Sequence, residues 1–263
     1  MSDIAPLTCF LKAVAGAFVG FFCFVFGFLG YLVSYGSYSS FVHASSKGTA
    51  IFPRFRDWVL PYNPKAYWDR RAKDFLKEGG LRELPGSSRK ILYDSLLDAL
   101  NRVSFSSLLE VGCGFGTNLK LVSDSFSGKR LFGIDLSGEM VSAARHYLKP
   151  YPKIGLERQN LAETGFGDES FDLVFSCETL LHVPKSEIRK TVKELVRLSK
   201  RYVVLIEPEL SRIPFFQRLF HAKHVFFHNY QNLFRKTGKT ELFYICSIPY
   251  QFRAVYIFKK LKG

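Results

Sequence analysis

The chain has 263 residues, with 37 lysines and arginines against 23 aspartates and glutamates, which gives a net charge of +14 at pH 7. At 47% hydrophobic and 23% charged residues, it is neither a disordered acidic tail nor a collagen-like chain. The length suits one domain of moderate size with an appendage and excludes two large domains.

The cysteines and the charge bear on the chain's surroundings. The cysteines are far apart, odd in number and form no C-x-x-C pair, so they predict neither a disulfide framework nor a zinc knuckle, and we expect a reducing compartment. The basic excess suits nucleic acid or an anionic membrane surface, and charge alone does not choose between them. The cysteines are Cys9, Cys23, Cys113, Cys177 and Cys246.

Residues 13–35 form an apolar run without a charged side chain. As a helix this run would be about 34 Å long, enough to cross a hydrocarbon core of about 30 Å. The alternative is a cleaved secretory signal, because Val42-His43-Ala44 loosely resembles a small-residue cleavage site. The apolar part of a signal is usually shorter, so the length favours an uncleaved transmembrane anchor.

The basic residues that flank this run predict its orientation. Lys12 precedes it, whereas Lys47, Arg54 and Arg56 follow it, and the positive-inside tendency then places the C-terminal side in the cytoplasm. We therefore expect four parts in chain order. They are an N-terminal tail (1–12), a transmembrane helix (13–35), a juxtamembrane linker (36–64) and a globular domain (65–263).

From residue 65 onward, helical and strand patterns alternate, which predicts a parallel sheet covered by helices on both faces. The last two strands are joined by a link too short for a parallel crossover, so they should be antiparallel neighbours. The expected helices are 64–78, 88–101, 138–148 and one that begins at Thr117; the expected strands are 107–111, 130–134, 171–175, 202–206, 241–245 and 253–258.

A cluster of glycines follows the first strand in the pattern Glu110-x-Gly112-x-Gly114-x-Gly116. Glycines at this place let the backbone approach a ligand closely, and the next helix offers unpaired N–H groups. A dinucleotide site would have the spacing G-x-G-x-x-G, but its last position is Thr117 here, which disfavours a nicotinamide-dependent oxidoreductase.

Asp135 ends the second strand, where a carboxylate would bind the ribose hydroxyls of a nucleoside in such a fold. The same carboxylate would repel the 2′-phosphate of NADP, which disfavours an NADP site. The alternative role for Asp135 is the N-cap of the next helix, which Ser137 could provide instead.

At these motifs the sequence resembles the class I S-adenosylmethionine-dependent methyltransferases, over residues 65–263. The similar segments are LLEVGCGFGTNLK, GIDLSGEM and QNLAETGFGDESFDLVFSCETLLHV, together with the helix YWDRRAKDF, which resembles the helix that covers the cofactor in many small-molecule members. The resemblance implies a Rossmann-like, doubly wound α/β sheet of seven strands with the last strand antiparallel, preceded here by one transmembrane helix.

The resemblance also implies roles for individual residues toward S-adenosylmethionine. Glu110, Gly112, Gly114 and Gly116 would surround the methionine half, Asp135 would hold the ribose, Asn160 and Leu161 would lie at the adenine edge, and Cys177 would lie beside the sulfonium. Many members carry Asp where this chain has Asn160. Asn still offers a carbonyl oxygen to the adenine amino group, so binding is expected, though it could be weaker.

The segment after the fourth strand holds the candidate catalytic residue, His182. Methyl transfer from a sulfonium needs positioning of the acceptor and, for a hydroxyl, removal of a proton, and histidine titrates in the range that this task requires. If 176–184 is helical, Glu178 and His182 share a face. The alternative is that His182 only shapes the pocket. Cys177 is expected to pack, since methyl transfer needs no nucleophilic residue.

The motif Asn/Asp-Pro-Pro-Tyr of methylases that act on nucleic-acid amino groups is absent at 176–179, which weakens a nucleic-acid substrate despite the charge. Residues 197–263 contain 13 basic and three acidic residues, and the stretch 213–234 is rich in Phe and His. This stretch suits a substrate cover, contact with anionic headgroups or a core-facing helix with a basic side. No Cys or carboxylate joins His221, His224 and His228, so no metal site is expected.

The sequence therefore predicts a membrane-anchored methyltransferase whose domain faces the cytoplasm and whose acceptor is a small molecule, apolar or lipid-linked. The alternatives are a non-catalytic module that binds the cofactor or a partner and, less favoured, a basic nucleic-acid methylase. The acceptor atom and the oligomeric state stay open.

Overall fold

The computed structural model describes residues 62–77, 87–215, 218, 222, 224–249 and 251–261. Contacts divide the chain into two compact units, and nearly all of the described residues belong to the one that comprises Tyr62–Ile213 and His224–Gly263. The predicted membrane span, 13–35, lies outside the described residues, as does nearly all of the predicted linker. Among the residues that are described, no helix has the length and apolarity needed to cross a membrane.

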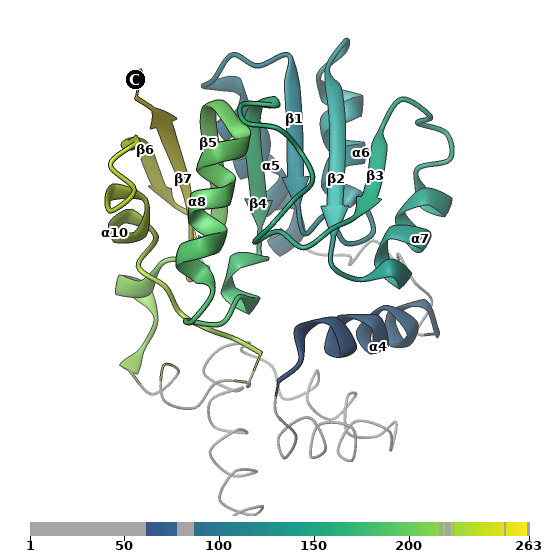
Figure 1. Cartoon of the computed structure of the whole chain (residues 1–263), viewed down its shortest axis with the longest axis horizontal. Coiled ribbons are helices and arrows are strands. Elements are labelled where there is room, and N and C mark those ends of the chain that lie inside the picture. The colour runs from purple at the N-terminus through teal and green to yellow at the C-terminus, as the bar shows by residue number, and fades with distance from the viewer. Residues whose placement is uncertain are drawn as a thin grey trace, which may run out of the picture. The chain divides into compact units, whose positions relative to one another are not determined.

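A seven-stranded sheet in the order β3-β2-β1-β4-β5-β7-β6 forms the centre of this unit (Figure 1). Strand β7 runs antiparallel to both of its neighbours, while the other pairs are parallel. The predicted sheet, with its final antiparallel pair, is confirmed. The strands are β1 (Ser107–Val111), β2 (Arg130–Asp135), β3 (Gly155–Arg158), β4 (Phe171–Cys177), β5 (Ser199–Pro208), β6 (Thr240–Ser247) and β7 (Arg253–Lys260).

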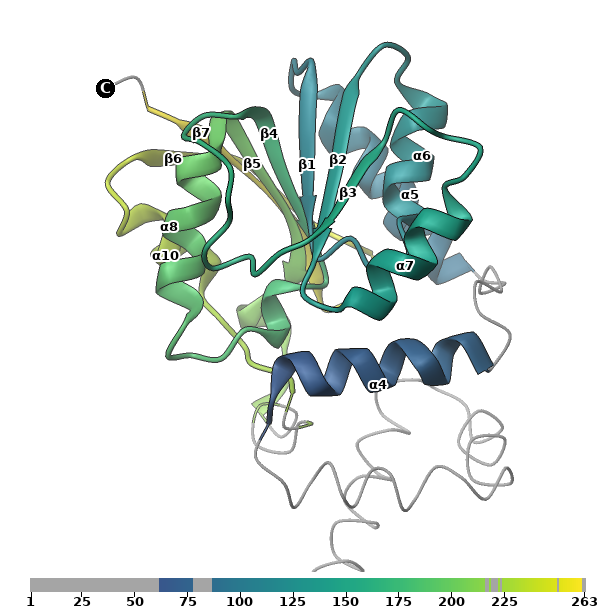
Figure 2. The same ribbon diagram turned by 45° about the vertical axis from the view of Figure 1, so that its right-hand side comes forward.

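Helices cover both faces of the sheet, as predicted for a doubly wound fold. Figure 2 shows α5, α6 and α7 on one side of the strands and α8 and α10 on the other. The helices are α4 (Pro64–Lys77), α5 (Ser87–Asn101), α6 (Thr117–Ser125), α7 (Gly138–Tyr147), α8 (Ile188–Leu198) and α10 (Tyr230–Arg235). Two short 3₁₀ turns are η1 (Leu180–His182) and η2 (Leu210–Arg212).

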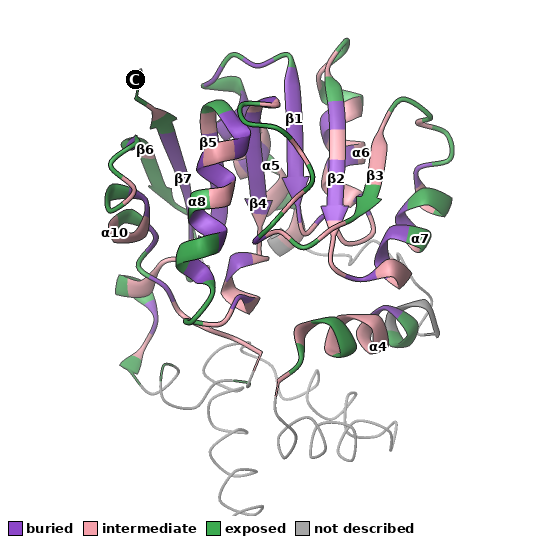
Figure 3. Ribbon diagram, viewed as in Figure 1, coloured by how far each residue is buried: buried purple, intermediate pink, exposed green. Residues whose placement is uncertain are grey.

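The central strands are apolar without alternation because both of their faces are covered. All five residues of β1 are buried, and neighbouring side chains enter different cores: Leu108 packs in the core beneath α5 and α6, and Leu109 in the core beneath α8 and α10. Figure 3 shows this burial concentrated on the inner strands. A continuous apolar run is thus the signature of a buried parallel strand. Because β1, β2 and β4 run parallel, their carboxyl ends lie at one edge of the sheet.

Helix α4 lies across this carboxyl edge (Figure 2). It begins where the sequence predicts: Asn63 Oδ1 accepts a hydrogen bond from the Ala66 amide at 3.0 Å, and Pro64 occupies the first helical position, which needs no N–H. Asp69 Oδ1 accepts a hydrogen bond from Ser137 Oγ at 2.7 Å, immediately before α7. A side-chain bond therefore ties α4 to the segment that follows β2.

The stretch after β4 is not the helix that would place Glu178 and His182 on one face. Glu178 has a left-handed backbone with φ of 51°, and within 176–184 only the three residues of η1 are helical. The Glu178 side chain instead forms an ion pair with Arg253, at the start of β7. The condition under which Glu178 and His182 would share a face is therefore not met, because the chain turns sharply at the end of the strand and i, i+4 geometry does not form.

Candidate functional site

The three glycines of the turn after β1 all have left-handed backbones, with φ of 70° at Gly112, 51° at Gly114 and 79° at Gly116. A Cβ on Gly112 would lie 2.2 Å from Thr179 Cγ2, and one on Gly116 would lie 2.5 Å from Leu148 Cδ1. A Cβ on Gly114 would meet no atom within 4 Å. Gly112 and Gly116 therefore serve close packing, and Gly114 is the glycine whose open side can face a ligand.

Glu110 is buried in β1, with 1% of its surface exposed. Asn118 Nδ2 donates a hydrogen bond to its Oε1 at 2.7 Å, whereas Oε2 has no hydrogen-bond partner among the described residues. Burial raises the pKa of Glu110 to about 8, although the bond from Asn118 opposes the rise. A buried carboxyl oxygen without a partner is costly, and a cationic ligand group would satisfy it. This oxygen fits the ammonium group of the predicted cofactor.

Asp135, at the end of β2, holds the glycine turn and the start of α7 together. Its Oδ2 accepts a hydrogen bond from the Gly114 amide at 2.9 Å, and its Oδ1 accepts one from the Ser137 amide at 2.9 Å. Ser137 is the N-cap of α7, since its Oγ accepts from the Met140 amide at 3.2 Å. Burial raises the pKa of Asp135, and the amide bonds oppose this. Each carboxylate oxygen can accept a further bond, so the ribose role stays open to Asp135.

The two residues predicted at the adenine edge follow β3. Asn160 is exposed, and its Oδ1 accepts a hydrogen bond from the Ala162 amide at 3.0 Å, which makes a local turn. Leu161 is half-buried and packs against the core beneath α8. The oxygen that would accept from an adenine amino group is thus already engaged by one backbone amide, with one lone pair remaining.

Cys177 ends β4 and is half-buried. Burial, and then the nearby carboxyl groups of Glu178 and Glu110, raise the pKa of its thiol well above the ordinary value. The thiol is therefore protonated at neutral pH, which agrees with a packing residue rather than a nucleophile. The next turn lies against the glycines: Thr179 Oγ1 is 3.3 Å from the Gly112 carbonyl oxygen.

His182 lies in a group of aromatic side chains beneath α4. Its ring is 4.7 Å, centre to centre, from Trp68 in an edge-on contact and 5.3 Å from His224 in a stacked one. Its Nδ1 donates a hydrogen bond to the His224 carbonyl at 2.7 Å, because a carbonyl can only accept. Burial lowers the pKa of His182 to about 4. The ring is neutral at pH 7, and its Nε2 presents a lone pair.

That low pKa makes His182 a weaker base than its residue type suggests. A general base works best when its pKa lies near the working pH. Tyr62 Oη donates to the His182 carbonyl at 3.2 Å, which adds a contact from the segment before α4. The position of His182 suits two roles. The ring can accept a hydrogen bond that orients a substrate, and this role fits its surroundings at least as well as accepting a proton does.

Sequence reasoning missed Glu207, which is completely buried near the end of β5. Its Oε1 accepts hydrogen bonds from Ser176 Oγ at 3.0 Å, the Thr179 amide at 2.9 Å and the Leu180 amide at 2.8 Å. Burial raises its pKa to about 7 against the opposing effect of these bonds. The sequence does mark Glu207 as a candidate, because it directly follows an apolar strand run, as Asp135 does.

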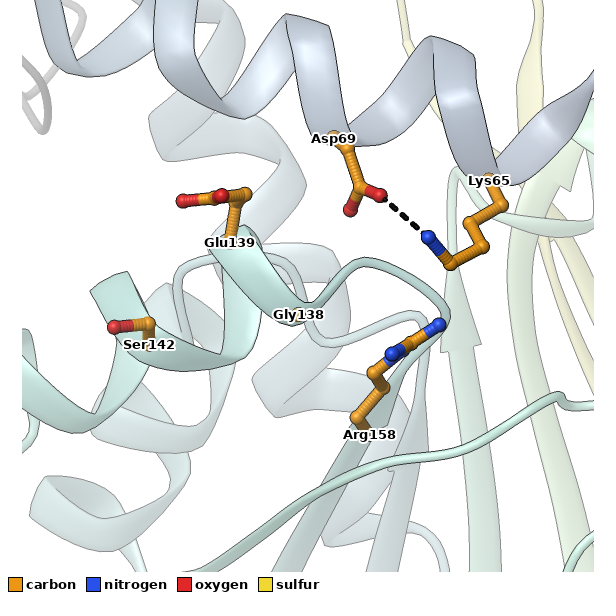
Figure 4. Close-up of a pocket in the computed structure, with 6 residues that line it drawn as sticks. All are labelled: Lys65, Asp69, Gly138, Glu139, Ser142 and Arg158. Atoms are coloured by element: carbon orange, nitrogen blue, oxygen red, sulfur yellow. Dashed lines mark hydrogen bonds and ion pairs between the residues drawn. The ribbon is translucent and has the colours of Figure 1, made fainter.

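An open cavity of about 420 Å³ lies beside the start of α7 (Figure 4). Asp69 and Lys65 reach it from α4, where their side chains form an ion pair at 3.0 Å, and Arg158 reaches it from the end of β3. Its lining is polar and carries charges of both signs. The lining residues are Lys65, Asp69, Gly138, Glu139, Ser142 and Arg158.

Residues 108–201, which carry the glycine turn, Asp135 and His182, match the family model described as a methyltransferase domain. The match covers about a third of the chain and is to a methyltransferase domain. For these residues the match supports the predicted class of enzyme. The match ends within β5, so it does not reach Glu207.

Curated methyltransferases align with less than half of the chain. It is 31% identical over 118 residues to a demethylmenaquinone methyltransferase of Lysinibacillus sphaericus, covering 44% of this chain and 50% of the relative. It is 26% identical over 111 residues to a phosphoethanolamine N-methyltransferase of Plasmodium falciparum (42% and 38%). It is 29% identical over 101 residues to a 2-methyl-6-phytyl-1,4-hydroquinone methyltransferase of Synechocystis (38% and 31%). The chain spans half or less of these relatives, so the activity and acceptor of the whole protein are proposals.

Solved structures show the same fold. Human N-acetylserotonin methyltransferase in complex with S-adenosylmethionine has a TM-score of 0.55 at 16% identity, over 65% of this chain and 52% of that one. An S-adenosylmethionine-dependent methyltransferase from Aquifex aeolicus has a TM-score of 0.53 at 19% identity, over 68% and 96%. At such identities the similarity establishes the architecture alone.

The different surroundings of two glycines in the turn generate a paired test. Gly112→Ala should lower the free energy of unfolding by about 3 kcal/mol, because it adds a left-handed alanine and a clash with Thr179. Gly114→Ala should lower it by only about 1 kcal/mol, because its side is open. Chemical denaturation measures both, and equal losses would contradict the packing role of Gly112.

The environment of His182 predicts its titration. Its folded pKa, about 4, lies below the ordinary 6.5, so its contribution to stability is present above pH 6.5 and is lost as the pH falls from 6.5 to about 4. NMR of ¹⁵N-labelled histidine should show a neutral ring with the proton on Nδ1 at pH 6. A ring that titrates near 6.5 would contradict its burial against Trp68.

Proposed function

We propose that the chain is an S-adenosylmethionine-dependent methyltransferase that acts on a small, apolar or lipid-linked acceptor at a membrane. The observation that carries the proposal is the buried Oε2 of Glu110, which has no partner in the part of the chain that the structure describes and lies beside a glycine turn whose central glycine is open. Such an arrangement suits a ligand with a cationic group that enters against the turn. It also suits methyl transfer better than hydride transfer, for which nothing in the turn provides the expected spacing.

When bound, S-adenosylmethionine supplies an activated methyl group, and the chain's own residues have to bind and orient. In this proposal Glu110 takes the ammonium group and Asp135 the ribose hydroxyls. Asn160 and Leu161 flank the adenine, and Cys177 lies beside the sulfonium. Gly114 leaves the room that the methionine half requires.

His182 is proposed to orient the acceptor. Its Nδ1 is engaged by the His224 carbonyl, so the lone pair of Nε2 is the group with which it can accept a hydrogen bond from an acceptor hydroxyl. The edge-on contact with Trp68 fixes the plane of the ring. In this role a low pKa is an advantage, because the ring stays unprotonated over the working range of pH.

The membrane anchor is supported by the sequence, and the apolar or lipid-linked acceptor is supported by the names of two relatives. Residues 13–35 form the uncharged run, and the basic residues after it favour a cytoplasmic domain. The names of two relatives give demethylmenaquinone and a phytyl hydroquinone as acceptors, and the phytyl group is a long hydrocarbon chain.

A second candidate is a module that binds the cofactor without catalysis. The observation in its favour is that Asn160 replaces the usual Asp and already gives its oxygen to the Ala162 amide. Binding of adenosylhomocysteine without any methylated product would favour this second candidate.

Cofactor binding should release a proton from Glu110. With a pKa of about 8, the side chain holds about 0.9 proton at pH 7, and an ammonium group at Oε2 would displace it. Affinity for adenosylhomocysteine should therefore rise with pH up to about 8. Calorimetry in buffers of different ionisation enthalpy measures the release. Glu110→Gln should abolish both effects, and a wild-type chain that binds without releasing a proton would contradict the role of Glu110.

Removal of Asp135, the proposed partner of the ribose hydroxyls, should weaken the binding of adenosylhomocysteine. Asp135→Ala should raise the Kd for adenosylhomocysteine at least tenfold, since two charge-assisted hydrogen bonds are lost. Glu157→Ala, an exposed acid on β3, is the matched control and should bind normally. A thermal-shift titration measures both, and equal affinity in the two variants would remove Asp135 from the site.

The acceptor class is tested with membranes. The full chain is incubated with membranes and methyl-labelled S-adenosylmethionine, and the products are separated into a lipid extract and a water-soluble fraction. Label should enter the lipid extract. Label found only in water-soluble small molecules would rule out the lipid-linked acceptor while keeping the methyltransferase.

A further inference from the structure

Glu207 is a charged side chain in a place that offers no water. It lies one residue before the end of β5, between β4 and β7, and none of its surface is exposed. A carboxylate in such a position requires hydrogen bonds to both of its oxygens. The structure provides them from one stretch of chain, the end of β4 and the turn that follows it.

Three consecutive backbone amides of that turn point to the one carboxylate. The amides of Thr179 and Leu180 donate to Oε1 at 2.9 and 2.8 Å, and the amide of Leu181 donates to Oε2 at 3.3 Å. Ser176 Oγ adds a fourth bond, at 3.0 Å to Oε1. These amides lie at the start of η1, where the first N–H groups of a helical turn have no carbonyl partners within the turn. Glu207 therefore supplies from another strand the acceptor that this turn lacks.

The same turn carries two features of the candidate site. At its start, the side chain of Thr179 packs directly behind Gly112, and its hydroxyl bonds to the carbonyl of that glycine. At its end, His182 reaches the His224 carbonyl and the edge of Trp68. Any displacement of the amides between them would move both the back of the glycine turn and the His182 ring.

On the basis of the proposed function, we propose that Glu207 is a positioning residue for methyl transfer. By holding the amides of residues 179–181, it fixes Thr179 behind the glycine turn and His182 at the carboxyl edge. It acts through these residues, because both of its oxygens are already bonded to donors of the chain itself.

Stability alone does not require a carboxylate at this position. Removing a carboxylate from water is costly, and well-packed apolar side chains commonly serve stability as well or better. What the carboxylate adds is geometry, because it is an acceptor on every side and can gather several donors at once. A glutamine would turn an NH₂ group toward one of the amides, and an aspartate would fall short by one methylene.

The experiment compares Glu207→Gln and Glu207→Asp with Glu209→Gln in the full chain. Glu209 is the matched control, because it lies two residues further on, is partly exposed and, among the described residues, accepts from the hydroxyls of Ser211 and Ser247. Three quantities are measured on the folded fraction. They are the Kd for adenosylhomocysteine, the titration of His182 by NMR, and the initial rate of label transfer into membranes as a function of membrane concentration.

Glu207→Gln should lower the saturating rate by about 10- to 100-fold with less than threefold change in half-saturation, as expected for misplaced groups. It should also move the titration of His182 upward by at least one pH unit, because a loosened turn admits water. Adenosylhomocysteine should bind within about fivefold of wild type. Glu207→Asp should recover part of the rate, and Glu209→Gln should match wild type in all three.

Two results would overturn the inference. One is a Glu207→Gln chain, or a Glu207→Asp chain if the first does not fold, whose His182 titration and rate equal those of Glu209→Gln. The other is loss of adenosylhomocysteine binding with His182 unchanged, which would place the effect in the cofactor site alone. If wild type transfers no label, the proposed function fails, and the His182 titration still decides whether Glu207 positions the turn.

Discussion

A buried carboxyl group has to find hydrogen-bond donors, and this requirement organises the carboxyl edge of the sheet. Glu110, Asp135 and Glu207 each lie in the last residues of a strand, still paired within the sheet, where water has little access. Burial raises the pKa of all three groups, because the hydrogen bonds around each carboxylate stabilise its charged form less than water would. The arrangement of loops at this edge follows from how each acid is satisfied.

Two of these acids are satisfied by the protein itself. Asp135 joins the amides of Gly114 and Ser137, and Glu207 gathers the amides of the turn after β4. Both therefore build the site by fixing loops that would otherwise have free N–H groups. Glu110 differs, because one oxygen has only Asn118 and the other has no partner among the described residues. The two acids that are satisfied fix the loops around them, and Glu110 is the acid to which the proposed function assigns a ligand.

The opposite side of the edge is aromatic. Helix α4 brings Tyr67 and Trp68 to the rings of His182 and His224, with Tyr62 just before the helix. This apolar cover removes water from His182 and keeps it neutral, which suits an oriented hydrogen bond better than strong base catalysis. A site with charged groups on the cofactor side and aromatic groups on the other fits a charged cofactor and an apolar acceptor.

The sequence by itself determined every strand of the sheet except β3, together with the reversed strand, the glycine turn and the acid that ends β2. Each of these is encoded locally, in apolar runs of about five residues or in fixed short spacings such as that from Glu110 to Gly116. Ser137, which the sequence offered as an alternative cap for α7, is the cap in the structure. The predicted span at 13–35 stays a prediction, because it lies outside the described residues.

Only the tertiary structure decided what each polar group at the edge is bonded to. The bonds from Thr179 to Glu207 and from Ser137 to Asp69 join residues 28 and 68 positions apart, and no local pattern specifies such pairs. The conformation of 176–184 has the same cause: its spacing would suit a helix, but a left-handed Glu178 and a distant carboxylate fix a different turn. Local periodicity selects an element, whereas the partners of buried polar groups are selected by which strands become neighbours.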